Sequence, residues 1–221
     1  MKKRNHKGTI TTYLIVIGVM VAIIGINMIQ TALFAGQKTK YTSEEAINII
    51  NDAESITLKK NYITFWVKDY QIVVDDEIVG EIKGKVFHPF GNIFTMYSSN
   101  GDVIMSEKEE ILHLNKQAQF YNANGNEDGR LEGAYFHILD YATYSGVEGK
   151  YIYDQAFSIR YNAVIKDDNT NIFSIKKQFW FDNYTITKNN EGVSTIKAAM
   201  MTAIEDSIKS HSSKSSSSSK K

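Results

Sequence analysis

Acid–base chemistry has one candidate pair in this sequence. The chain contains five histidines, and His137 precedes Asp140 by three residues, so the two could pair as acid and base. Such a pair is common by chance in an aromatic segment, and a catalytic base also needs a shaped pocket. The sequence has no HExxH, GxSxG, Walker A or GxGxxG motif and no cysteine. We therefore expect no catalytic residues, no metal and no cofactor.

Clustered carboxylates are a second possible source of chemistry. Asp75-Asp76-Glu77 and Asp167-Asp168 each lie between apolar runs, where aspartate favours a turn. The ligand spacing of an EF-hand does not follow either cluster. We interpret both clusters as turn formers rather than calcium ligands.

The strongest candidates for binding are aromatic side chains that crowd residues 133–158, between two predicted β units. Tyrosine-rich loops on a rigid scaffold suit recognition of a protein, glycan or peptide, which predicts a binding surface here. The alternative is that these side chains form a lid packed over the core. The candidates are Tyr135, Phe136, Tyr141, Tyr144, Tyr151 and Tyr153.

Two lysine pairs are candidates for contacting a lipid headgroup. Lys83 and Lys85 alternate with apolar or small residues along a predicted strand, and Lys176 and Lys177 follow a similar hairpin. The alternative is a solvated strand face with ordinary surface ion pairs. Charge favours this alternative, because all 25 acidic residues but only 17 of the 25 basic ones lie between residues 8 and 208. So acidic a domain is also a poor candidate for binding nucleic acid.

The middle of the chain must position these candidates, and its residue pattern is typical of antiparallel strands. Short runs rich in isoleucine, valine, tyrosine and phenylalanine lead to Asp76, Asn100 and Asn124, which are 24 residues apart. That length fits one hairpin and its connection, and the Asn-Gly pairs supply the positive φ angles of two-residue type I′ turns. Two less regular units follow, with turns at residues 167–169 and 189–190. The repeat predicts a mainly β, antiparallel meander or barrel.

Helices flank the strands on both sides. Residues 41–54 predict a short amphipathic helix that Thr42 or Ser43 can cap. The helix that Ser194 can cap is apolar nearly all round, so it is expected to be enclosed rather than laid on a surface. Residues 210–221 contain only serine, lysine and one histidine and are predicted to be disordered.

The N-terminal region predicts a membrane anchor. Residues 8–37 form an uncharged run of 30 positions, and we assign a transmembrane helix to residues 10–35. The positive charges that precede it predict a cytoplasmic N-terminus and an extracytoplasmic domain on the cell membrane. A cleaved signal peptide is one alternative, although the apolar run is too long for one. Lys7-Gly8 also resembles the start of type IV pilin-like proteins, but Tyr13 stands where those usually carry glutamate.

Four segments together resemble the LURP-one-related proteins, which are relatives of the tubby C-terminal domain and of phospholipid scramblases. The resemblance covers roughly residues 62–210, and its segments are residues 79–87, 93–103, 172–181 and 195–206. It implies a closed antiparallel β-barrel of about twelve strands with the hydrophobic C-terminal helix through or against it. It also implies an association with lipid, because tubby domains bind phosphoinositide headgroups through basic residues on the barrel wall. The aromatic stretch at residues 133–153 departs from the family pattern as an insertion.

These features predict a single-pass, membrane-anchored binding module that is not an enzyme. Its expected ligand is a lipid or an envelope protein, and the alternative is a minor pilin-like component of a surface or secretion apparatus. The predicted divisions are a cytoplasmic tail, a transmembrane helix, a linker with the short helix, the barrel, and the disordered tail, at residues 1–9, 10–35, 36–60, 61–209 and 210–221.

Overall fold

The computed structural model describes residues 40–61, 67–85, 93–110, 116–133, 140–155, 162–178 and 183–215. The chain divides into two compact units, Met1–Lys38 and Thr39–Lys221, and every described residue belongs to the second unit. The predicted transmembrane segment, residues 10–35, therefore lies outside the described residues. Among the helices that are described, none combines the length and the apolar character needed to cross a bilayer.

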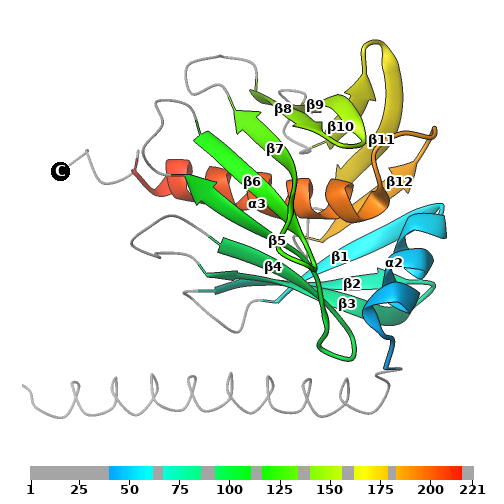
Figure 1. The fold of residues 1–221 in the computed structure, drawn as a ribbon. Helices are drawn as coiled ribbons and strands as arrows, with labels where there is room; N and C mark the ends of the chain where they lie inside the picture. The colour runs from blue at the N-terminus through cyan, green and yellow to red at the C-terminus, as the bar shows by residue number, and fades with distance from the viewer. Residues whose placement is uncertain are drawn as a thin grey trace, which may run out of the picture. The chain divides into compact units, whose positions relative to one another are not determined.

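Twelve antiparallel strands form a closed barrel around a C-terminal helix (Figure 1), which confirms the predicted mainly β fold. Each strand pairs with its neighbours in sequence, and β1 pairs with β12 to close the wall. The strands are β1 (Ser55–Asn61), β2 (Val67–Val74), β3 (Glu77–Lys85), β4 (Ile93–Ser98), β5 (Val103–Glu110), β6 (Lys116–Asn122), β7 (Glu127–Gly133), β8 (Asp140–Gly146), β9 (Gly149–Gln155), β10 (Asn162–Asp167), β11 (Thr170–Lys177) and β12 (Tyr184–Lys188).

The three units spaced by 24 residues are hairpins, as predicted, but only the first has the type I′ geometry. Asp75 and Asp76 form a two-residue turn between β2 and β3, with φ angles of 48° and 66°. Positive φ at both central positions is what a type I′ turn requires. Aspartate tolerates this conformation because its short polar side chain can bond to nearby backbone.

The Asn-Gly pairs were expected to form type I′ turns, and that prediction is wrong. The Gly101 amide donates to the Ser98 carbonyl, and the Ser98 amide donates to Asp102, which closes a three-residue loop between β4 and β5. Gly101 has a φ of 99° and takes the left-handed position of a β-bulge, next to a register shift in the ladder. Gly125 repeats this arrangement between β6 and β7.

Two of the predicted boundaries are wrong. The barrel begins with β1, in which Ile56 and Leu58 are buried between partly exposed neighbours, rather than at residue 61. The hairpin expected around residues 189–190 does not form. β12 pairs with β11 and β1 instead and then leads into the C-terminal helix, because closing a fully antiparallel barrel requires its last strand to pair with its first.

The aromatic stretch at residues 133–153 forms strands of the barrel where the structure describes it. It contains β8 and most of β9, which pair from Asp140 with Gln155 to Gly146 with Gly149. Tyr151 and Tyr153 are buried and alternate with less buried residues, which is the two-residue period of a strand with one face inward.

The short helix α2 (Ser43–Asp52) begins where the sequence predicts. The Thr42 hydroxyl accepts a hydrogen bond from the Glu45 amide at 3.4 Å, and the Glu45 carboxylate accepts one from the Thr42 amide at 2.8 Å. This reciprocal arrangement is a capping box. The hydrogen bonds from Thr42 lower the pKa of Glu45. Ala46 and Ile50 are buried against the barrel, where α2 contacts β3, β4 and β5.

Replacing Thr42 with alanine is expected to lower the free energy of unfolding by about 1 kcal/mol, the usual effect of losing an N-cap. The measurement is urea unfolding of the full chain in neutral detergent micelles. Thr42→Ser keeps the hydroxyl and is the matched control. If the serine variant lost as much stability as the alanine variant, the capping interaction would not be the cause.

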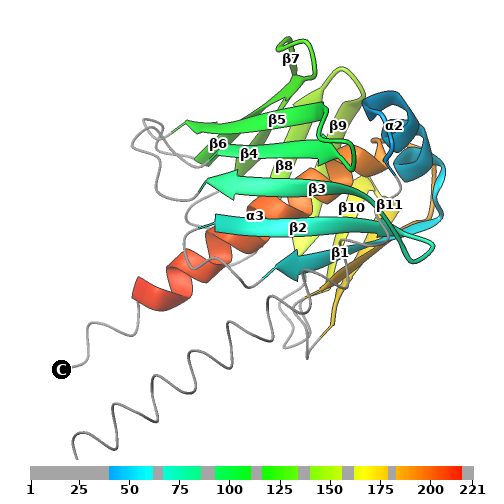
Figure 2. The ribbon, with the colours of Figure 1, turned by 90° about the horizontal axis from the view of Figure 1, so that it is seen from below.

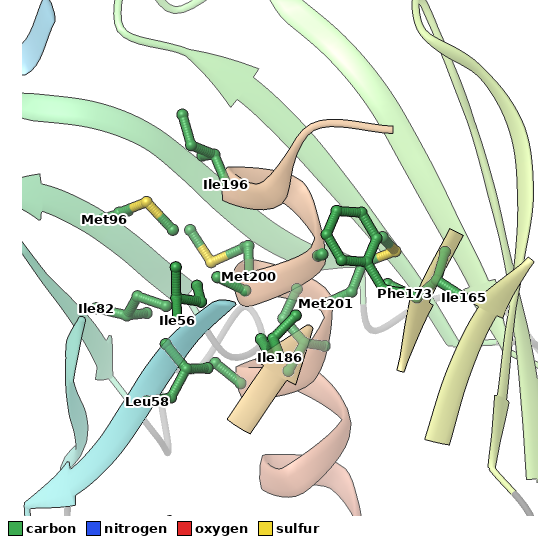
Figure 3. Packing of buried hydrophobic residues seen from close by; sticks show 14 of the residues in the cluster. Ile56, Leu58, Ile82, Met96, Ile165, Phe173, Ile186, Ile196, Met200 and Met201 are labelled. Atoms are coloured by element: carbon green, nitrogen blue, oxygen red, sulfur yellow. The ribbon is translucent and has the colours of Figure 1, made fainter. Parts of the chain in front are cut away.

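The C-terminal helix α3 (Thr195–Ser215) fills the barrel, as predicted for a helix that is apolar nearly all round. All residues from Thr195 to Ile204 are buried. Figure 3 shows Met200 facing the side chains of Ile56, Ile82 and Met96, while Met201 faces Phe173. α3 continues to Ser215, so the predicted disorder is wrong for residues 210–215; extending an established helix is much easier than nucleating one.

Candidate ligand-binding site

The meander gives the barrel two different ends. Links from even-numbered to odd-numbered strands are short turns, and α2 packs at the same end, which we call the hairpin end. Links from odd-numbered to even-numbered strands lie largely outside the described residues. α3 leaves the barrel at this second end, which we call the exit end (Figure 2).

Many exposed acidic side chains lie at the hairpin end. Among the acidic residues whose exposure the structure describes, every exposed one except Glu132 lies in its turns, at the adjoining strand ends or around α2. These residues are Glu44, Glu45, Asp52, Glu54, Asp75, Asp76, Glu77, Asp102, Glu127, Asp167, Asp168 and Glu191. The acidic excess of the domain therefore says little about the charge at the exit end.

Four lysines lie at the exit end on β1 and β11, the two strands that flank β12. Lys59 and Lys60 lie at the end of β1, and Lys176 and Lys177 lie at the end of β11, with Tyr184 of β12 between them. We call these four lysines the basic rim. Alternation along the strands directs Lys59 and Lys176 outward and the other two inward. Because neighbouring strands are about 4.8 Å apart and Lys59 is two residues farther along the wall than Lys176, the Cα atoms of these outward lysines are separated by about 12 Å.

The inward lysines meet a carboxylate from α3. Asp206 lies 2.6 Å from Lys60 and 3.6 Å from Lys177, measured from carboxylate oxygen to ammonium nitrogen. The hydroxyls of Tyr70 and Tyr184 donate to the same carboxylate at 2.6 and 2.5 Å. The Asp206 side chain is 7% exposed and each of the two lysine side chains is 13% exposed, so the cluster lies at the edge of the core.

The surroundings of Asp206 keep it ionised. Burial raises its pKa, but the charge of Lys60 and the hydrogen bonds from Lys60, Tyr184 and Tyr70 outweigh burial and hold the pKa at about 2. Each inward lysine also lies over a tyrosine ring, Lys60 at 6.0 Å from the centroid of Tyr70 and Lys177 at 5.3 Å from that of Tyr184. The cluster thus places two ammonium groups beside the outward lysines.

A second ionic cluster holds the other end of α3. Lys197 is 3% exposed and pairs with Asp128 at 2.8 Å and with Glu148 at 2.9 Å. Burial lowers its pKa, but hydrogen bonds with these carboxylates and with Tyr144 outweigh burial and raise it overall. Glu148 also accepts a hydrogen bond from the Ser194 amide at 2.7 Å, immediately before the helix. Charges that are paired in this way fix the position of a helix, so we assign this cluster a structural role.

The lysines predicted from the sequence do not form one group. Lys83 is exposed on β3, pairs with Glu81 at 2.6 Å and lies 5.4 Å from the ring centroid of Tyr97, as expected of a solvated strand face. Lys85 ends the same strand, and its side chain is not described. β2, β1 and β12 separate β3 from β11, so Lys83 and Lys85 are distant from Lys176 and Lys177.

The predicted aromatic surface is not present where the structure describes it. Tyr144, Tyr151 and Tyr153 are buried inside the barrel, so the prediction of an exposed recognition loop is wrong for these three. Burial raises the pKa of Tyr153 far above its usual range. The side chain of Tyr141 is not described, and Tyr135, Phe136 and His137 lie outside the described residues.

Five residues of the site were missed: Lys59, Lys60, Tyr70, Tyr184 and Asp206. Lys59 and Lys60 end a strand that the sequence interpretation left in the linker. A signal for Asp206 was present, because a charged residue on a helix that is apolar all round must find a partner when the helix is enclosed.

No family model, curated protein or solved structure shows significant similarity to the chain. The ligand of the basic rim must therefore be inferred from the geometry and charge of these four lysines.

Proposed function

We propose that this chain is a non-enzymatic, membrane-anchored binding module, and that its basic rim binds the phosphate group of an anionic lipid headgroup. The observation that carries the proposal is the pair of lysines on each side of β12, at the end of the barrel opposite most of the acidic residues whose exposure is described. Lysine near an anionic lipid surface contributes about 1 kcal/mol of binding free energy. The distribution of charge thus favours contact through the exit end.

The interior of the barrel supports a binding role over a catalytic one. α3 fills the space that a substrate would need, and its side chains pack against the inward faces of the strands (Figure 3). The two charged residues of α3 that the structure shows to be buried, Lys197 and Asp206, bind groups of the barrel wall. The resemblance to LURP-one-related and tubby-like proteins also implies a barrel closed around a hydrophobic helix. The same resemblance implies a lipid ligand.

The anchor and its orientation belong to the same proposal. The uncharged run of 30 residues and the positive charges before it support one N-terminal span with the barrel on the extracytoplasmic side. The mass of the mature chain tests this part separately. An intact N-terminus supports the anchor, whereas a chain that begins at Thr9 would favour the pilin-like alternative.

Neutralising the outward lysines is expected to weaken binding to anionic vesicles. The full chain is placed in phosphatidylcholine nanodiscs and mixed with vesicles containing equal amounts of phosphatidylcholine and phosphatidylglycerol. Lys59→Gln combined with Lys176→Gln removes two charges, so the affinity should fall by about 30-fold. Added salt should also weaken binding of the wild-type chain, because exposed charges are screened.

The matched control is Lys150→Gln, which removes an exposed lysine on β9 near the hairpin end. This variant should bind like the wild-type chain. Absence of binding by the wild-type chain, or equal binding to vesicles of pure phosphatidylcholine, would rule out recognition of anionic lipid. A loss of about fivefold in the Lys150 variant, as expected for removal of one charge, would show that total charge, rather than the basic rim, governs binding.

A further inference from the structure

The carboxylate of Asp206 occupies the position that a bound phosphate group would seek. It lies between the inward lysines and accepts hydrogen bonds from Tyr70 and Tyr184. These are the kinds of partner that a phosphate oxygen prefers, namely ammonium groups and hydroxyl donors. Asp206 belongs to α3, whereas all four of these partners belong to the barrel wall.

The contacts of Asp206 are unequal. Lys60 is within hydrogen-bond distance at 2.6 Å, but Lys177 lies 3.6 Å away, beyond the range of a good hydrogen bond. Lys177 is therefore the inward lysine whose attraction to Asp206 is the weaker of the two.

We infer that Asp206 is an internal competitor for the phosphate group, so that occupation of the basic rim loosens the hold of the barrel on the C-terminal half of α3. This inference rests on the proposed function, because it concerns the same lysines. An anion that draws Lys177 and Lys60 outward weakens their attraction to Asp206. By linkage, the contact with Asp206 weakens binding of the anion by the same factor as the anion weakens that contact.

Two substitutions have effects of opposite sign under this inference. Asp206→Asn removes the competing charge but keeps an acceptor for the tyrosine hydroxyls, so phosphate affinity should rise by about 5–20-fold. Tyr184→Phe removes a hydrogen bond to the same carboxylate, which leaves Asp206 a stronger competitor for the lysines. Phosphate affinity should then fall by about two- to fivefold. Simple destabilisation of the fold would shift both affinities in the same direction.

The test uses the full chain in phosphatidylcholine nanodiscs and two probes in separate arms, soluble short-chain phosphatidylglycerol and inorganic phosphate. Titration calorimetry gives the affinity of the wild-type chain and of both variants. Tighter binding of the lipid than of inorganic phosphate identifies the lipid headgroup as the source of the phosphate group. Equal affinities would identify phosphate itself, and the competition would apply to it in the same way.

Hydrogen exchange on the wild-type chain tests, without any substitution, whether a bound anion loosens the C-terminal half of α3. Saturating short-chain phosphatidylglycerol should speed exchange of the amides around Ile204 and Asp206, and leave those around Ala198 unchanged. Slower exchange at the C-terminal half, or lower affinity in Asp206→Asn, would overturn the inference. If the wild-type chain bound neither probe, the proposed function itself would fail. If binding depended on Lys59 and Lys176 but not on Asp206, only the competition would be wrong.

Discussion

Asp206→Ala is expected to lower the free energy of unfolding by about 3–5 kcal/mol, the range for a buried ion pair that loses one partner. The reason is that Lys60 and Lys177, each 13% exposed, would keep their charges in the mouth of the barrel without this carboxylate. The hydroxyls of Tyr70 and Tyr184 would also lose their bonds to it. Urea unfolding of the full chain in neutral detergent micelles measures the loss.

A pH series separates the charge of Asp206 from its packing. Its folded pKa of about 2 lies below the ordinary value of 3.8, so the ionised carboxylate contributes about 2 kcal/mol to stability. A depressed pKa gives stability that is complete well above pH 3.8 and is lost as the pH falls toward 2. The wild-type chain should therefore lose more stability on acidification than Asp206→Ala does. A difference that stays constant down to about pH 2 would contradict the role of charge.

Lys197→Met is expected to lower the free energy of unfolding by about 2–3 kcal/mol, less than Asp206→Ala. Methionine keeps most of the length of the side chain but leaves the carboxylates of Asp128 and Glu148 without the ammonium group. These carboxylates are 20% and 30% exposed, so water can replace part of the lost interaction. The same unfolding measurement in micelles gives the loss.

The matched control for Lys197→Met combines it with Asp128→Asn and Glu148→Gln. Neutral amides need no counter-charge, so this triple variant should recover part of the lost stability. A triple variant less stable than Lys197→Met alone would mean that packing or hydrogen bonding, rather than charge, dominates at this site. A larger loss in Lys197→Met than in Asp206→Ala would show that exposure does not set the order of the two effects.

The features predicted correctly from the sequence are those that local chemistry determines. The turn at Asp75 and Asp76, the capping box of Thr42 and the enclosure of α3 each follow from residues that are close together along the chain. The type of turn at the Asn-Gly pairs was missed because a hairpin loop and its bulge form together, and the ladder register decides between two and three residues.

The candidate site could not be assembled from the sequence, because its parts meet only in the closed barrel. Lys60 and Asp206 are 146 residues apart, and the rim exists only because β1 and β11 both pair with β12. The buried tyrosines were misread for a related reason. An aromatic-rich segment looks the same whether it is a surface loop or two strands facing inward, until its partners across the sheet are known.

The seam between β1 and β12 also constrains how the protein is made. The ribosome completes every strand of the wall before it synthesises α3, which follows β12 in the chain. The inward side chains of the strands pack against α3, so α3 must be inside the barrel when β1 and β12 pair. Pairing of the first strand with the last makes folding slow, because the contacts that complete the structure join the most distant parts of the domain.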